Sequence, residues 1–214
     1  NKEEAKKMLL EMQQFTNEKP SKVARMHLVF LKGTYLVDTE EWDSELADIK
    51  VDISDLNVSL RSQYYFLEGM KAYSKGNVKQ LDSIIALMEK DYSRESFLAS
   101  SQGASFCSGI SRDKATSSDI VESQIRQNQL LALSASLEAN SPIAETYFLK
   151  SIELDESISY SYGPPSIQKP THELYAEWLL SQNRKEEASE QFELALKFAP
   201  KRLLALKSIE KTKV

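Results

Sequence analysis

The sequence predicts an all-α fold, and three observations support this prediction. Apolar residues recur at the helical period of 3.6 along nearly the whole chain. Glycine and proline occur only six times each, where average usage would give roughly 15 and roughly 11. No segment alternates between apolar and polar residues for long enough to predict a sheet.

Composition excludes several classes of protein. The chain has 214 residues and a formal net charge of −5, so it lacks the basic surface that nucleic-acid-binding proteins carry. The sequence contains no stretch of about 18 apolar residues, the length that a membrane-spanning helix needs. Cys107 is the single cysteine, so no disulfide can form within the chain and the compartment stays open. Its setting of serines and glycines predicts no reactive thiol.

The apolar stripes before residue 92 predict five helices. We expect them over 2–15, from Val23 to Asp38, from Thr39 to Leu46, from Leu60 to Tyr73 with a stop at Gly76, and from Leu81 to Met88. The chain starts at Asn1 inside a helical pattern with no N-terminal cap. We therefore interpret it as a fragment of a longer chain.

The residue composition changes between Ser93 and Ser118. The nine serines and two glycines of this stretch predict a loop that contains at most a short helix around Phe97. Helical patterns then resume. They cover Ile120 to Ala139, Pro142 to Leu154, Thr171 to Leu180 with Thr171 as the N-cap, Lys185 to Phe198, and Pro200 to Lys211, with an insertion at 160–170.

An internal repeat is visible in the last helices. Ala188, Phe192, Ala195 and Pro200 stand at offsets of 0, 4, 7 and 12, and Ala176 lies twelve residues before Ala188. Small residues at such positions let two helices approach closely, while the aromatic ring fills the space toward the next unit. Matching residues occur in earlier units. The unit before the last consists of Ala132, Ala144, Phe148 and Ser151, which lie 44 residues before their counterparts. A looser copy consists of Gly69, Leu81, Ile85 and Met88. The chain begins with a degenerate unit that has His27 near the small-residue position, and with a single helix that carries Ala5, Leu9 and Met12.

This spacing resembles the tetratricopeptide repeat, a helix–turn–helix unit of about 34 residues. The resemblance is clear over 119–214, degenerate over 1–92, and absent from the serine-rich loop. The Gly163-Pro164-Pro165 turn, followed by Lys169-Pro170-Thr171-His172-Glu173-Leu174, is similar to a segment before the last repeat in a group of bacterial members. The resemblance implies one right-handed α-α superhelix of about four helix pairs plus a C-terminal capping helix. It implies no specific activity.

In tetratricopeptide proteins the first helix of each pair lines a concave groove, and we place this chain's groove by the same register. The expected groove residues are Phe66, Met70, Tyr73, Arg126, Gln129, Leu133, Glu173, Glu177 and Leu180. Aromatic and mixed polar side chains on such a surface suit an extended peptide or a partner helix. The sequence therefore predicts a non-catalytic scaffold that binds a protein or peptide, without a cofactor. Some of these side chains could equally belong to the core.

Two other functions remain open at this point. The groove and the serine-rich loop could bind a small molecule or a glycan. His172 and Glu173 begin like a zinc-protease motif, but Ala176 stands where that motif needs its second histidine. A metal- or carboxylate-assisted hydrolase is therefore the least favoured function, and a structural role for His172 is favoured. The further residues of interest lie in the insertion and are Tyr160, Tyr162, Gly163, Pro164 and Pro165.

Overall fold

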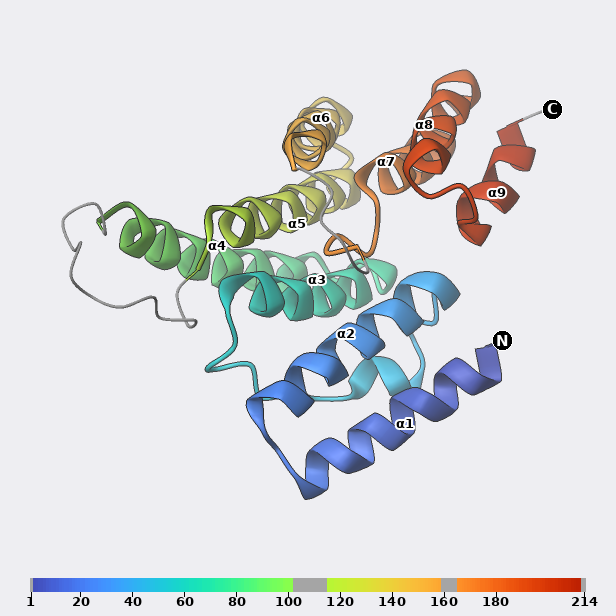
Figure 1. Ribbon diagram of the computed structural model, residues 1–214. Coiled ribbons are helices and arrows are strands. Elements are labelled where there is room, and N and C mark those ends of the chain that lie inside the picture. Colours follow the sequence, from blue (N-terminus) through green and yellow to red (C-terminus); the bar gives the residue numbers. More distant parts are fainter. Residues whose placement is uncertain (1, 102–114, 159–164, 213–214) are drawn as a thin grey trace.

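The computed structural model describes residues 2–101, 115–158 and 165–212, and within these ranges it holds helices and no strand (Figure 1). The all-α prediction is confirmed. The helices are α1 (Lys2–Glu18), α2 (Lys22–Thr39), α3 (Val58–Ser74), α4 (Val78–Ser101), α5 (Ser117–Leu137), α6 (Ser141–Ser157), α7 (Thr171–Ser181), α8 (Lys185–Phe198) and α9 (Leu203–Ile209), with 3₁₀ turns at Glu45–Asp48 and Glu210–Thr212.

Polar side chains fix where several helices begin. The side chains of Ser21, Asn57 and Asn140 each accept a hydrogen bond from the backbone three residues later, at the starts of α2, α3 and α6. Thr116 and Asp119 form a reciprocal capping box at the start of α5. These caps satisfy backbone N–H groups that the helices leave without partners.

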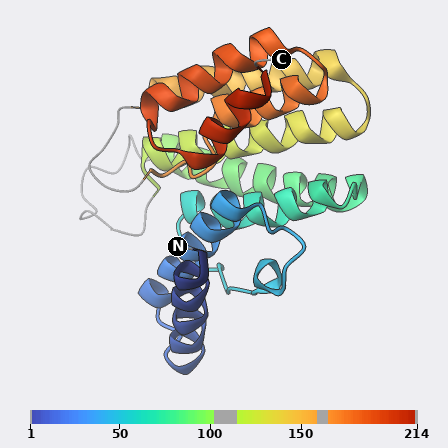
Figure 2. The same ribbon diagram turned by 90° about the vertical axis from the view of Figure 1, so that its right-hand side faces the viewer.

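Successive helices pack against each other along the chain, and α5 packs against α3 in addition to its neighbour α4. This produces a layered array that runs from α1 and α2 at one end to α8 and α9 at the other (Figures 1 and 2). No helix in the described part of the chain is both long and apolar enough to cross a bilayer.

The small residues of the repeat lie where the helices approach most closely. Ala132, Ala144, Ala176 and Ala188 have no exposed surface. At Gly69 on α3, a Cβ atom would lie only 2.5 Å from Cδ1 of Leu130 on α5. The four alanines are thus buried as expected, and Gly69 lies at a close contact between two helices.

The structure corrects the predicted secondary structure in three places. Helix α4 continues to Ser101, so the first third of the expected serine-rich loop is helical. Serine ranks in the middle of the helix-propensity scale, so a helix can continue through serine positions. The remainder of that loop, with Cys107, lies outside the described residues.

The expected helix from Thr39 to Leu46 does not form, because α2 itself runs to Thr39 and ends at Glu40 in a left-handed conformation with φ 56°. Only a 3₁₀ turn follows. Thr171 is not a cap either, since Pro170 precedes α7 at the N-cap position and the Thr171 side chain is buried in hydrogen bonds with Gln129 and Ser151.

The degenerate unit is corrected as well. His27, expected near its small-residue position, is exposed. The close approach on α2 instead occurs at Gly33, where a Cβ atom would lie 1.9 Å from Oε1 of Gln168. The residue that comes so near belongs to the insertion before α7.

Candidate functional site

The nine expected groove residues lie on α3, α5 and α7, but most of them are covered. Only Tyr73, Glu177 and Leu180 keep intermediate exposure, whereas the other six are buried. Apolar members such as Phe66 contribute to the common core. The polar members Arg126, Gln129 and Glu173 are buried because another part of the chain lies against them.

That part is the stretch from Pro165 to Pro170, which we call the inner segment. It runs between α3 and the start of α7 (Figure 1). Arg126 Nη2 donates to the carbonyl oxygen of Ser166 at 2.6 Å, and Gln129 Nε2 donates to that of Lys169 at 2.9 Å. Because both acceptors are backbone oxygens, α5 binds this segment largely through its main chain.

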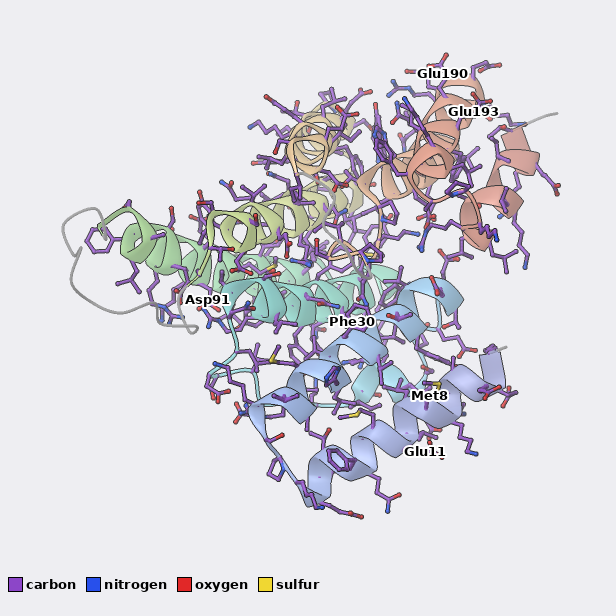
Figure 3. All side chains as sticks on the ribbon, viewed as in Figure 1. Met8, Glu11, Phe30, Asp91, Glu190 and Glu193 are labelled. Carbon is purple, nitrogen blue, oxygen red and sulfur yellow. The ribbon has the colours of Figure 1, made fainter. Side chains whose placement is uncertain are left out.

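Gln168 attaches the inner segment to α2 and α3. Its Nε2 donates to the carbonyl oxygen of Phe30 at 2.9 Å and to the hydroxyl of Thr34 at 2.8 Å. Its Oε1 accepts from Nε2 of Gln63 at 2.5 Å. Phe30, which Figure 3 labels, lies on α2 where this helix faces α3. The absence of a side chain at Gly33 leaves the space that Gln168 fills.

Lys169 is the centre of a buried charge cluster. Its Nζ lies 2.8 Å from Glu173, 2.5 Å from Glu177 and 3.7 Å from Glu40. On the other side of Glu173, Arg202 donates to both carboxylate oxygens and reaches Asp38 at 3.2 Å. The cluster joins α2 and α7 to the turn between α8 and α9.

Burial and charge have opposite effects on the two α7 carboxylates. Burial tends to raise the pKa of Glu173, but Lys169 and Arg202 outweigh it, so the pKa lies below its ordinary value. At Glu177, burial prevails over Lys169 and raises the pKa, with Glu173 and Glu40 adding repulsion. Glu173 is therefore a structural counter-ion, whereas Glu177 is the less satisfied carboxylate.

Next to this cluster an open space remains, which we call the inner pocket. Its volume is about 280 Å³. The expected groove residues Met70, Tyr73, Leu133 and Glu177 line it. The other lining residues are Glu40, Trp42, Ser74, Leu174, Trp178 and Ser181. The groove register thus brings four of its nine residues to one pocket, with aromatic and acidic side chains in its wall.

His172 and Glu173 are both engaged in the structure. His172 Nδ1 lies 2.7 Å from Gln191 Oε1, its Nε2 lies 3.3 Å from Glu156, and its ring stacks on Phe198. Among the described residues, no group of three or more histidine, cysteine or acidic side chains is arranged to hold a metal ion. Of the insertion residues, Tyr160, Tyr162, Gly163 and Pro164 lie outside the described residues.

The role of the inner segment is the feature that sequence reasoning missed. A signal was present, because Arg126, Gln129 and Glu173 stand at inward-facing positions of helices, and buried polar groups need hydrogen-bonding partners. Arg126 finds some partners on the helices, at Ser59 and Ser62 of α3. The insertion supplies further partners, namely the carbonyl oxygens of Ser166 and Lys169 and the Lys169 ammonium group that pairs with Glu173.

In comparisons with protein-family models, curated proteins and solved structures, no match to this chain was found.

Proposed function

We propose that this chain is a non-catalytic helical-repeat module of the tetratricopeptide type, arranged as a right-handed superhelix, that binds an extended segment of a partner protein. The observation that carries this proposal is the inner segment. Helix α5 already holds one non-helical stretch of chain through hydrogen bonds to its backbone carbonyls, and α2 and α3 hold the same stretch through the Gln168 side chain. A surface that accepts one such stretch has the chemistry to accept another beside it.

The inner pocket is the site proposed for the partner. Two carboxylates, Glu40 and Glu177, line it, and no lysine or arginine does so among the described residues. Of its three aromatic lining residues, Tyr73 keeps intermediate exposure and adds apolar surface. A partner residue with an apolar stem and a positive end, lysine or arginine, complements this lining.

A glycan is less well suited to the same pocket. Sugars bind proteins by stacking on exposed aromatic faces, but Trp42 is only 8% exposed and Trp178 only 3%. Trp178 is already packed against Phe148 and Tyr175. A hydrolase around Glu173 is also less well supported, because this carboxylate is fully buried between two cations.

The proposal can be tested by closing the pocket from its rim. Ser74 and Ser181 are exposed lining residues, so Ser74→Trp and Ser181→Trp should fill the opening without disturbing the core. The matched control is Ser83→Trp on the exposed side of α4. Each protein is immobilised and used to capture partners from an extract of its native source, with identification by mass spectrometry.

We expect at least one partner protein to be captured by the unmodified chain and by Ser83→Trp. The same partner should not be captured by Ser74→Trp or by Ser181→Trp. A synthetic peptide from that protein should then bind the unmodified chain, and its binding should weaken when its lysine or arginine is replaced by norleucine. Equal capture by all four proteins, or capture by none, would contradict binding at the inner pocket.

A further inference from the structure

A second opening lies on the other side of the molecule's charge cluster, and we call it the side cavity. Its volume is about 250 Å³. It is bounded by the start of α5, the end of α6, the inner segment, and the turn between α8 and α9. None of the described residues that line it also lines the inner pocket, so it is a separate site.

The walls of the side cavity are mainly apolar. Ile158, Pro165, Ile167 and Pro170 line one part, and Phe198 with Ala199 lines another. Phe198 is 54% exposed, although its ring is stacked on His172. Leaving an aromatic ring so open beside other apolar side chains is unfavourable in water. The cavity therefore offers contact surface to the apolar part of a ligand.

The positive groups at the cavity already have partners. Arg202 lines it, but its guanidinium donates to both oxygens of Glu173 and to Asp38. His172 is held by Gln191 and Glu156. An anionic ligand would have to break these pairs, so the cavity is poorly suited to one.

Three carboxylates, by contrast, line the cavity with weaker compensation. Asp155 accepts the Thr171 backbone N–H at the long distance of 3.4 Å. Glu156 is half exposed, and its carboxylate lies 3.3 Å from Nε2 of His172. Glu122 accepts from the Ser59 hydroxyl and lies 3.8 Å from Arg126.

The electrostatics of Asp155 support the same conclusion. Burial raises the pKa of Asp155 above its ordinary value, because it outweighs the hydrogen bonds from Thr171 and the weaker attraction of His172 and Arg126. The surroundings of Asp155 thus supply less positive charge than its desolvation requires. A cation placed in the cavity would make up this deficit.

We propose that the side cavity binds a small organic amine, with its apolar body between Ile158, Ile167 and Phe198 and its ammonium group facing Asp155, Glu156 and Glu122. The size of the cavity suits a compact molecule rather than a folded partner, since drug-sized sites begin at about 300 Å³. This site does not depend on the function proposed for the inner pocket.

The test compares 2-phenylethylamine with 2-phenylethanol, which has the same apolar body and no charge. Binding is measured by isothermal titration calorimetry and by ¹H–¹⁵N spectra. A charge-assisted hydrogen bond strengthens binding about tenfold or more, so we expect the amine to bind at least about tenfold more tightly than the alcohol. The largest spectral changes should occur at Asp155–Ile158 and at Phe198.

Two variants with matched controls locate the interaction. Asp155→Asn preserves shape and should remove most of the preference for the amine, whereas Glu153→Gln, on the exposed side of α6, should retain it. Ser118→Trp fills the rim and should abolish binding of both probes, whereas its exposed neighbour Ser117→Trp should not. Melting temperatures measured without probe verify that each variant is folded.

The proposal is wrong if neither probe binds the unmodified protein, or if the amine and the alcohol bind equally. It is equally wrong if folded Asp155→Asn keeps the full preference, or if Ser118→Trp still binds the amine. In those cases the cavity would be an apolar hollow or the amine would bind elsewhere.

Discussion

At the scale of single residues, the positions without side chains or with minimal ones decide how near the helices come. Gly69 packs so closely on Leu130 that a Cβ atom has no room, and four alanines of the repeat are completely buried. The sequence predicts the spacing of these residues, because close packing demands small residues at fixed intervals. It does not predict which residues they contact, since those contacts depend on how the helix pairs stack on one another.

Gly69→Ala gives the first prediction. Alanine favours helix over glycine by about 1 kcal/mol, yet the new methyl group must displace Leu130 at 2.5 Å. Overpacking of this kind costs about 1–3 kcal/mol, so the free energy of unfolding in urea should fall. The further change Leu130→Val should recover part of the loss. A gain in stability from Gly69→Ala alone would show that this contact is not tight.

The charge cluster gives a second prediction, about two carboxylates one helical turn apart. Glu173→Gln leaves Lys169 and Arg202 short of a buried counter-ion and should lower the free energy of unfolding by about 3 kcal/mol. Glu177→Gln should cost less than about 1 kcal/mol, because Lys169 keeps Glu173 as its partner and the burial penalty on Glu177 disappears.

The pH dependence follows from the depressed pKa of Glu173. Its ionised form stabilises the fold above the ordinary value of 4.5, and this contribution is lost as the pH falls through the lower pKa of the folded state. Glu173→Gln should therefore flatten the decline in stability below pH 4.5. Urea unfolding at a series of pH values measures this, and an unchanged acid decline would contradict the assignment.

At the scale of elements, apolar periodicity located every long helix but not the ends that lack a clear stop signal. Helix α4 runs on through a serine-rich stretch to Ser101, and α2 absorbs the start of the expected third helix. The inner segment was predicted only as part of an insertion between two helices. Its hydrogen bonds to α2 and α3 join residues more than a hundred positions apart, and no local pattern encodes such contacts.

Gly33→Ala tests how the inner segment is held. The added methyl group would occupy the position of the Gln168 amide, so Gln168 must leave Thr34, Phe30 and Gln63. We expect faster amide hydrogen exchange at Gln168 and Lys169, and a loss of stability of about 1–3 kcal/mol from the buried groups left unpaired. Gln168→Ala should expose the same amides. Unchanged exchange in both variants would show that Gln168 does not anchor the segment.

At the scale of the whole molecule, the array is more than a chain of neighbouring pairs. Repeat proteins normally transmit stability only between adjacent units. Here Arg202 reaches Asp38, and Lys169 reaches Glu40, so the end of α2 is tied directly to the last helices. By comparison, Arg61 on α3 pairs with Asp91, which Figure 3 labels, on the neighbouring helix α4.

Two tryptophans make this coupling measurable. Trp178 lies on α7, whereas Trp42 follows α2. Trp178→Phe and Trp42→Phe each leave one reporter, and we expect the two urea transitions monitored by fluorescence to coincide. Adding Gln168→Ala and Arg202→Gln should separate them, with the Trp42 signal changing first. Because both tryptophans line the inner pocket, separate transitions in the single variants would show that the α2 side and the α7 side of this pocket unfold independently.

The way α5 holds the inner segment also bears on how this protein can change over generations. Arg126 and Gln129 donate hydrogen bonds to carbonyl oxygens, which every amino acid supplies. Position 166 can therefore accept many substitutions during evolution, provided that the backbone keeps its conformation. Positions 33 and 168 accept fewer substitutions, because the side chain at one position must fit the space left by the other. Substitutions at these two positions should therefore occur together or be removed by selection.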